Sequence, residues 1–122
     1  MPRDSLGEFE HLVLLAIVRL GDQAYGVPIV DEIESRTGRE ISRAAVYIAL
    51  RRLTKKELVS STLGDPSPER GGRAKRFFRV EHAGLDMLAE SRRALTQMWE
   101  GIQPALDQRD LGRARVGARQ RS

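Results

Sequence analysis

The stretch SRAAVYIALRRLTKK, residues 42–56, decides how this 122-residue chain folds. Ser42 is a favoured residue just before a helix, because its hydroxyl can accept a hydrogen bond from a free N–H of the first turn. Apolar residues then recur at helical spacing, which predicts a helix over residues 43–56 with one buried stripe. The expected stripe consists of Ala45 or Val46, Ala49, Leu50 and Leu53.

The opposite face of this helix is basic and carries an aromatic side chain. Its members are Arg43, Ala44, Tyr47, Ile48, Arg51 and Lys55. Basic residues on an isolated helix often form only a solvated face. Half-buried packing explains Tyr47 as well as a contact with a partner does. Its place beside Arg43 and Arg51 favours the contact.

Two further helices are expected before this one. The first covers residues 6–19, where apolar side chains recur at helical spacing before the stop at Gly21; they are Leu12, Leu15, Ala16 and Leu20. The second opens within residues 25–28, because proline is tolerated in a first turn where its missing N–H is not needed. Its inward stripe is Ile29, Val30 and Ile33, and residues 37–38 end it.

A β-hairpin is predicted after the third helix. LVSSTL (residues 58–63) and KRFFRVE (residues 75–81) are short strand-like runs on either side of the loop GDPSPERGGRA. We expect Phe77, Val80 and Leu58 to anchor the hairpin on the core. The cations at or near its tip are Arg70, Arg73, Lys75 and Arg76.

A fourth helix is expected from residue 82. Its apolar residues alternate at spacings of three and four, with Arg92 in one slot, and they are Leu85, Leu88, Leu95, Trp99 and Ile102. Such a heptad-like stripe is typical of helices that associate. Gly101 and Pro104 should end or kink the helix, and the arginine-rich tail has too little apolar content to fold alone.

Charge is segregated along the chain, whose net charge is +4. Residues 1–38 carry three basic and seven acidic side chains, net −4, and residues 80–106 carry two and four, net −2. Residues 39–79 carry eleven basic and four acidic side chains, net +7, and the tail 107–122 adds five arginines and two aspartates, net +3. The basic middle segment predicts one positive face that suits nucleic acid.

Several functional classes find no support in the sequence. The absence of cysteine excludes disulfides, thiolate nucleophiles and sulfur-ligated metals. His11 and His82 lie on different elements without matched carboxylates, so no metal site, catalytic residue or cofactor is expected. Gly71 and Gly72 lack the context of a phosphate-binding loop. Without a signal peptide or a membrane-spanning run, the protein is expected in the cytoplasm.

Three helices and a hairpin, the third helix and the hairpin tip being basic, make up the order of a winged helix-turn-helix. The fold class expected is therefore mainly α with a small β-hairpin, followed by a C-terminal dimerisation helix. We expect the third helix to enter the major groove of double-stranded DNA, with groove contacts from Ser42, Arg43, Tyr47, Arg51 and Lys55. The hairpin cations would contact the backbone or the minor groove, because positive charge on flexible stems binds phosphates by counterion release.

Over residues 6–100 the sequence resembles PadR-type transcriptional regulators. Three stretches carry the likeness: LVLLAIVRLGDQAYGVPIVDEIESRTG, ISRAAVYIALRRLTKKELV and GGRAKRFFRVEHAGLDML. The resemblance implies a DNA-binding repressor, usually homodimeric through its C-terminal helix and in some members controlled by a small-molecule inducer. Glu57 stands where the family commonly has glycine, Glu81 replaces a threonine before the fourth helix, and the wing is longer than usual.

The expected organisation has three parts: a winged helix-turn-helix over residues 6–81, a dimerisation helix over residues 82–106 and a basic tail over residues 107–122. The dimer contacts are expected from Leu88, Leu95, Trp99 and Ile102. Two alternatives stay open. The dimer interface could hold a small aromatic compound near Met98 and Trp99, or the winged helix could dock a protein partner.

Overall fold

A computed structural model of the chain describes residues 6–65, 74–102 and 107. The chain divides into two compact units, residues 1–89 and residues 90–122. The first unit contains three helices, a hairpin and the start of the last helix, α4 (His82–Trp99). The second unit contains the remainder of α4. Within the described ranges, no helix combines the length and apolar character that a membrane span requires.

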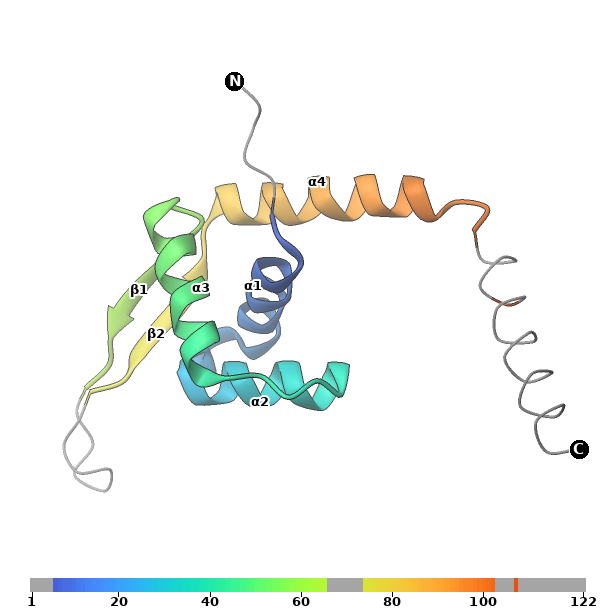
Figure 1. Ribbon diagram of the computed structural model, residues 1–122. Coiled ribbons are helices and arrows are strands. Elements are labelled where there is room, and N and C mark those ends of the chain that lie inside the picture. Colours follow the sequence, from blue (N-terminus) through green and yellow to red (C-terminus); the bar gives the residue numbers. More distant parts are fainter. Residues whose placement is uncertain (1–5, 66–73, 103–106, 108–122) are drawn as a thin grey trace, which may run out of the picture. The chain divides into compact units, whose positions relative to one another are not determined.

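The three predicted helices are present (Figure 1). They are α1 (Glu8–Leu20), α2 (Gly26–Thr37) and α3 (Arg43–Lys55), with a short 3-10 turn, η1 (Gly21–Gln23), between α1 and α2. Gly38 ends α2 in the left-handed conformation, with φ 73°, which glycine adopts without a steric penalty. The expected boundaries are therefore correct to within about two residues.

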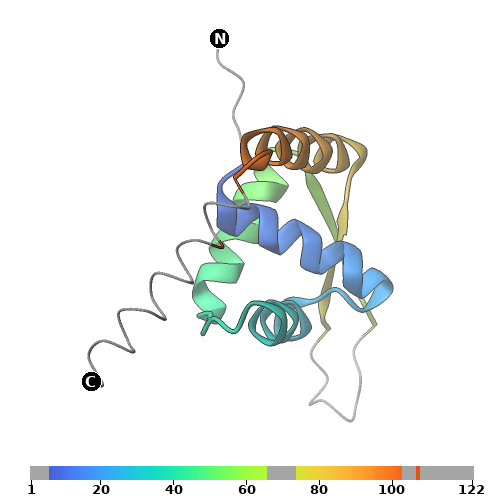
Figure 2. The ribbon, with the colours of Figure 1, turned by 90° about the vertical axis from the view of Figure 1, so that its right-hand side faces the viewer.

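One core holds the first unit together. Helix α1 crosses the middle of the view in Figure 2, and contacts join it to α2, α3 and strand β2 (Arg76–Val80). The predicted stripes of α2 and α3 are buried: Ile29, Val30 and Ile33 on α2, and Val46, Ala49, Leu50 and Leu53 on α3. The alternative, Ala45, is half-buried.

The prediction for the inward face of α1 is wrong only at Leu15, because Ala16 is buried and Leu12 and Leu20 pack against the core. Leu15 is 41% exposed, whereas the buried residues of α1 are Val13, Leu14, Ala16 and Ile17. Residues 12–17 form an unbroken apolar run, so helical spacing alone could not select the face. The contacts with α2 and α3 select it.

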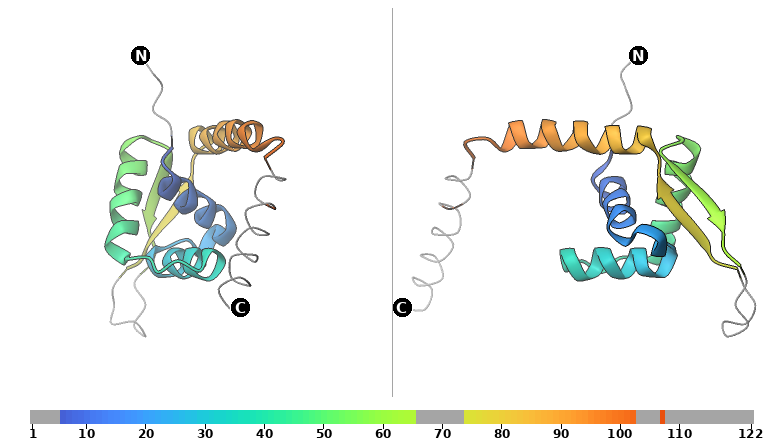
Figure 3. Two further views of the ribbon diagram at one scale, coloured as in Figure 1. Left: turned by 45° about the vertical axis from the view of Figure 1, so that its right-hand side comes forward. Right: turned by 180° about the vertical axis from the view of Figure 1, so that it is seen from behind.

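Strand β1 (Val59–Leu63) pairs antiparallel with β2, placing Val59 opposite Val80 and Leu63 opposite Arg76. The Phe78 N–H donates a hydrogen bond to the Ala24 carbonyl, with 2.8 Å between nitrogen and oxygen. On its other edge, β2 is therefore joined to the segment that follows η1. Both strands can be followed in the two views of Figure 3.

Phe78, and not the expected Phe77, anchors the hairpin in the core. Phe78 is 9% exposed and belongs to the buried cluster together with Leu58, while Val80 packs against that cluster. Successive residues of a strand point to opposite faces. Phe78 shares a face with Val80, and Phe77 points to the other side. The predictions for Leu58 and Val80 are confirmed.

The start of α4 is joined to Leu58, the residue just before β1. The Glu81 N–H donates to the Leu58 carbonyl at 2.8 Å, and the Glu81 carbonyl accepts from the Leu85 N–H at 3.0 Å. A Cβ atom at Gly84 would overlap the Leu58 carbonyl oxygen, so this close approach requires glycine. Leu88, one turn further on, is only 8% exposed and belongs to the core.

Glu57 has a left-handed backbone conformation, with φ 62°. It lies between α3 and β1 and is exposed. The turn therefore keeps a geometry that favours glycine, and the side chain carries a steric cost of about 1 kcal/mol.

Replacing Glu57 with glycine should stabilise the fold. Relief of the left-handed strain outweighs the extra unfolded-state freedom of glycine, so we expect the free energy of unfolding to rise by about 0.5 kcal/mol or more. Urea unfolding followed by circular dichroism measures the change. Lys55→Gly is the matched control and should destabilise, because Lys55 is the exposed last residue of α3 and forms no ion pair with the described carboxylates. Equal effects of the two substitutions would contradict this account.

Candidate nucleic-acid interface

Helix α3 begins where the sequence predicts. The Ser42 hydroxyl accepts a hydrogen bond from the Ala45 N–H at 2.9 Å, which satisfies one of the free donors of the first turn. The cap fixes where α3 begins, and the buried stripe fixes which side of the helix faces solvent. The predicted contact residues of this element are all exposed: Ser42, Arg43, Tyr47, Arg51 and Lys55.

The exposed face of α3 is richer than the predicted set. Arg52 is also exposed, and Ile48 is 49% exposed next to Tyr47 at 48%. Within the described part of the chain, no carboxylate forms an ion pair with Arg43, Arg51, Arg52 or Lys55. Four cations are thus available to a partner, around a centre of one aromatic and one aliphatic side chain.

Two cations of the middle segment form ion pairs with carboxylates of α1. Arg39 forms an ion pair with Glu8 at 2.7 Å, and Lys56 forms one with Glu10 at 3.2 Å. The hydrogen bond and charge of Arg39 lower the pKa of Glu8. The prediction of one positive face made by the whole middle segment is therefore too broad. Carboxylates of the acidic N-terminal segment neutralise part of the middle segment's positive charge where α1 meets the ends of α2 and α3.

Tyr47 both packs and remains accessible. A Cβ atom at Gly26, the first residue of α2, would overlap the Tyr47 hydroxyl and lie 2.8 Å from the ring carbon Cζ. One end of the phenol therefore lies against the start of α2, while about half of the side chain faces solvent. Packing and contact, the two explanations of Tyr47 from the sequence, are compatible.

The hairpin cations have different surroundings. The Arg76 guanidinium donates to the Ser61 hydroxyl at 2.9 Å across the strand pair. The Lys75 ammonium lies 3.8 Å from the centre of the Tyr25 ring. Arg70 and Arg73 lie outside the described residues. Of the predicted wing contacts, Arg76 is exposed and Lys75 is partly covered.

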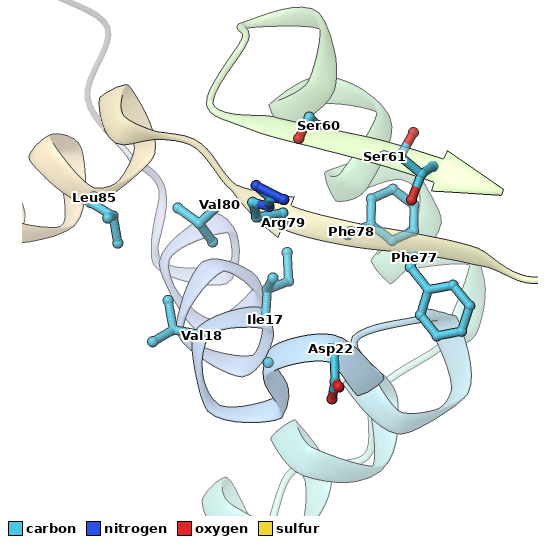
Figure 4. Close-up of a pocket in the computed structure, with 12 residues that line it drawn as sticks. Ile17, Val18, Asp22, Ser60, Ser61, Phe77, Phe78, Arg79, Val80 and Leu85 are labelled. Carbon is cyan, nitrogen blue, oxygen red and sulfur yellow. The ribbon is translucent and has the colours of Figure 1, made fainter. Parts of the chain in front are cut away.

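A hollow of about 630 Å³ lies on the side of the hairpin that faces α1 (Figure 4). Ile17 and Val18 of α1 border it, with Leu85 from the start of α4. The exposed Arg79 also lines it, together with Ser60, its partner in the strand register. Arg79 therefore belongs to this hollow, with α1, rather than to the exposed face of α3.

The second unit presents the later part of the predicted stripe. Leu95 and Trp99 are each 52% exposed and Ile102 is 41% exposed, whereas Leu88 is buried in the core of its own chain. The helix ends at Trp99, and Gly101 follows with φ 80°. Pro104 lies outside the described residues. Leu88 has little surface left for a partner, and the dimer contacts remain a prediction.

The two histidines lie on different helices, His11 on α1 and His82 at the start of α4. Burial lowers the pKa of His11, and His82 lies 3.9 Å from Asp86 within α4. Among the described residues, no group of three or more histidine, aspartate or glutamate side chains is placed to hold a metal ion.

The exposed basic helix, its serine cap and the hairpin define a winged helix-turn-helix of the kind found in DNA-binding regulators. The sequence profile of the transcriptional regulator PadR-like family matches residues 14–90. The chain belongs to this family, and it is accordingly a DNA-binding transcriptional regulator. It is 31% identical over 103 residues to a Lysinibacillus sphaericus protein called uncharacterized protein X, covering 83% of this chain and 86% of that protein.

Solved structures share the fold. A PadR-family transcriptional regulator from Eggerthella lenta matches with a TM-score of 0.62 and 24% identity, over 81% of this chain and 86% of that one. A PadR-family regulator from Clostridium difficile matches with a TM-score of 0.60 and 21% identity, over 84% and 97%. These similarities confirm the predicted winged-helix architecture.

Proposed function

We propose that the protein acts in the cytoplasm as a homodimeric, sequence-specific repressor that reads double-stranded DNA with α3. The observation that carries the proposal is the exposed face of α3, where four cations that pair with no carboxylate of the described ranges accompany Tyr47 and Ile48. Arg39 and Lys56, two other cations of the middle segment, pair with carboxylates of α1. The cations of the exposed α3 face therefore differ from them in remaining available to a partner.

The chemistry of this face suits the major groove. An arginine can donate two parallel hydrogen bonds to the O6 and N7 atoms of guanine, and an aliphatic side chain can contact the methyl group of thymine. Arg43 and Arg51 are our candidates for base contacts, and Ile48 for an apolar one. Lys55 and Arg52 near the helix end would bind phosphates, as would Arg76 of the hairpin and, in the sequence between the strands, Arg70 and Arg73.

Dimerisation would place two copies of α3 on one duplex. The apolar stripe of α4 supports this part of the proposal, since half-exposed leucine and tryptophan side chains at heptad-like spacing gain stability when a second helix covers them. Half-sites would then be about 34 to 36 Å apart, one turn of the duplex. Repression is proposed from the family resemblance. Selection of bound duplexes from a random pool tests the whole proposal, because an enriched palindrome requires specificity and dimer symmetry together.

Arg51→Ala should weaken binding to the selected operator by about 1 to 3 kcal/mol and relax the base preference at one position. Fluorescence anisotropy with the operator and with a scrambled duplex measures both effects. Arg19→Ala is the matched control, because it removes the same charge from an exposed site on α1. An equal loss on both duplexes after Arg51→Ala would contradict base reading by α3.

Trp99→Ala should weaken the dimer by at least about 2 kcal/mol, or roughly 30-fold in the dissociation constant, because a large aromatic side chain would be removed from the interface. Sedimentation equilibrium measures this constant. Thr96→Ala is the control, at an exposed site of α4 outside the apolar stripe. A dimer of unchanged strength after Trp99→Ala would remove Trp99 from the proposed interface.

A further inference from the structure

Tyr25 connects the hairpin to the start of α2. It is the residue just before α2, in an extended backbone conformation. Its ring meets the Phe77 ring edge-on, with 5.4 Å between centroids and 72° between planes. The Lys75 ammonium lies 3.8 Å from the centre of the same ring. Both geometries are favourable, the first through the aromatic quadrupoles and the second as a cation–π contact.

The next residue, Gly26, contacts helix α3 instead. The Tyr47 ring of α3 lies so close to Gly26 that any side chain there would displace it. Two successive residues thus touch the two elements proposed to bind DNA. Tyr25 holds the hairpin, and Gly26 accommodates α3.

Backbone hydrogen bonds reinforce the connection on the hairpin side. The Phe78 N–H donates to the Ala24 carbonyl at 2.8 Å, and the Gly64 N–H donates to the Lys75 carbonyl at 2.7 Å. The first joins β2 to the residue before Tyr25, and the second extends the strand pair beyond β1. Ring contacts and backbone contacts therefore act at the same place.

We propose that Tyr25 and Gly26 form a positioning joint that sets the hairpin relative to α3, so that both meet one duplex in register. This inference rests on the proposed function. Its physical basis is that contacts made from two separate elements add in full only when a rigid connection holds the elements in the bound geometry. Lys75, expected from the sequence to contact phosphate, is a positioning residue under this proposal.

A neutral substitution separates positioning from charge. Tyr25→Leu removes the ring and leaves every charge in place. We expect operator affinity to fall about 5- to 20-fold and the slope of log affinity against log salt to become shallower by about one to two, because hairpin cations lose phosphate contacts. Tyr25→Phe keeps the ring contacts with Phe77 and Lys75, so its slope should lie closer to that of the wild type than to that of Tyr25→Leu. Circular dichroism verifies that each variant is folded at the temperature used.

A steeper salt slope for Tyr25→Leu would overturn the joint, because it would mean that the freed Lys75 gains a phosphate contact. An unchanged slope would also overturn it, because the hairpin cations would then have lost no phosphate contact. Hydrogen exchange provides a readout without DNA. In Tyr25→Leu the Phe78 amide should exchange at least about fivefold faster while the Leu50 amide of α3 is unchanged. Equal protection of Phe78 would also overturn the joint. If the wild type enriches no duplex, the proposed function fails, and hydrogen exchange still decides whether the joint exists.

The α3 side of the joint has its own test. Gly26→Ala should displace Tyr47 and reduce discrimination between operator and scrambled duplex about tenfold, with little change in the salt slope. Gly7→Ala is the matched control, because a Cβ atom there would meet only a Glu10 carboxylate oxygen at an ordinary 3.8 Å. Undiminished discrimination by Gly26→Ala would show that Gly26 does not position the recognition helix.

Discussion

The structure depends on burial of one stripe of α3. Val46, Ala49, Leu50 and Leu53 are almost completely removed from solvent by α1, α2 and the beginning of the hairpin. Burial of that apolar surface supplies the main driving force for docking the helix. It also determines which residues of α3 lie on the opposite, exposed face. The arginines and Tyr47 are exposed because the stripe is not.

Electrostatics refine this arrangement. The acidic N-terminal segment does more than balance charge, since Glu8 and Glu10 of α1 pair with Arg39 before α3 and with Lys56 at its end. Both pairs are at least partly exposed, so each contributes little to stability. Their effect is on the pattern of charge, because they bring the two flanking cations into contact with carboxylates and leave those of the exposed face of α3 available.

Residues 24–26 form one short segment that contacts both the hairpin and α3. There the chain turns from η1 into α2, and three successive residues hold β2 by a backbone hydrogen bond, the hairpin side chains by an aromatic ring, and Tyr47 by a close glycine contact. Under the proposed function both elements contact DNA, and such a link would hold them in one geometry. The segment contains no charge of its own and would escape a search for DNA-binding residues by composition.

The order of elements is predictable from the sequence, as are the cap at Ser42, the buried stripes of α2 and α3 and the exposed face of α3, because helical periodicity and capping are local properties. Packing in the folded chain selects which of the adjacent Phe77 and Phe78 enters the core and which face of the apolar run in α1 is buried, and it places Leu88 in the core of its own chain. The same holds for the pairing of Arg39 and Lys56 and for the place of Lys75 above Tyr25. These choices rest on contacts between residues far apart in the chain, which local spacing does not encode.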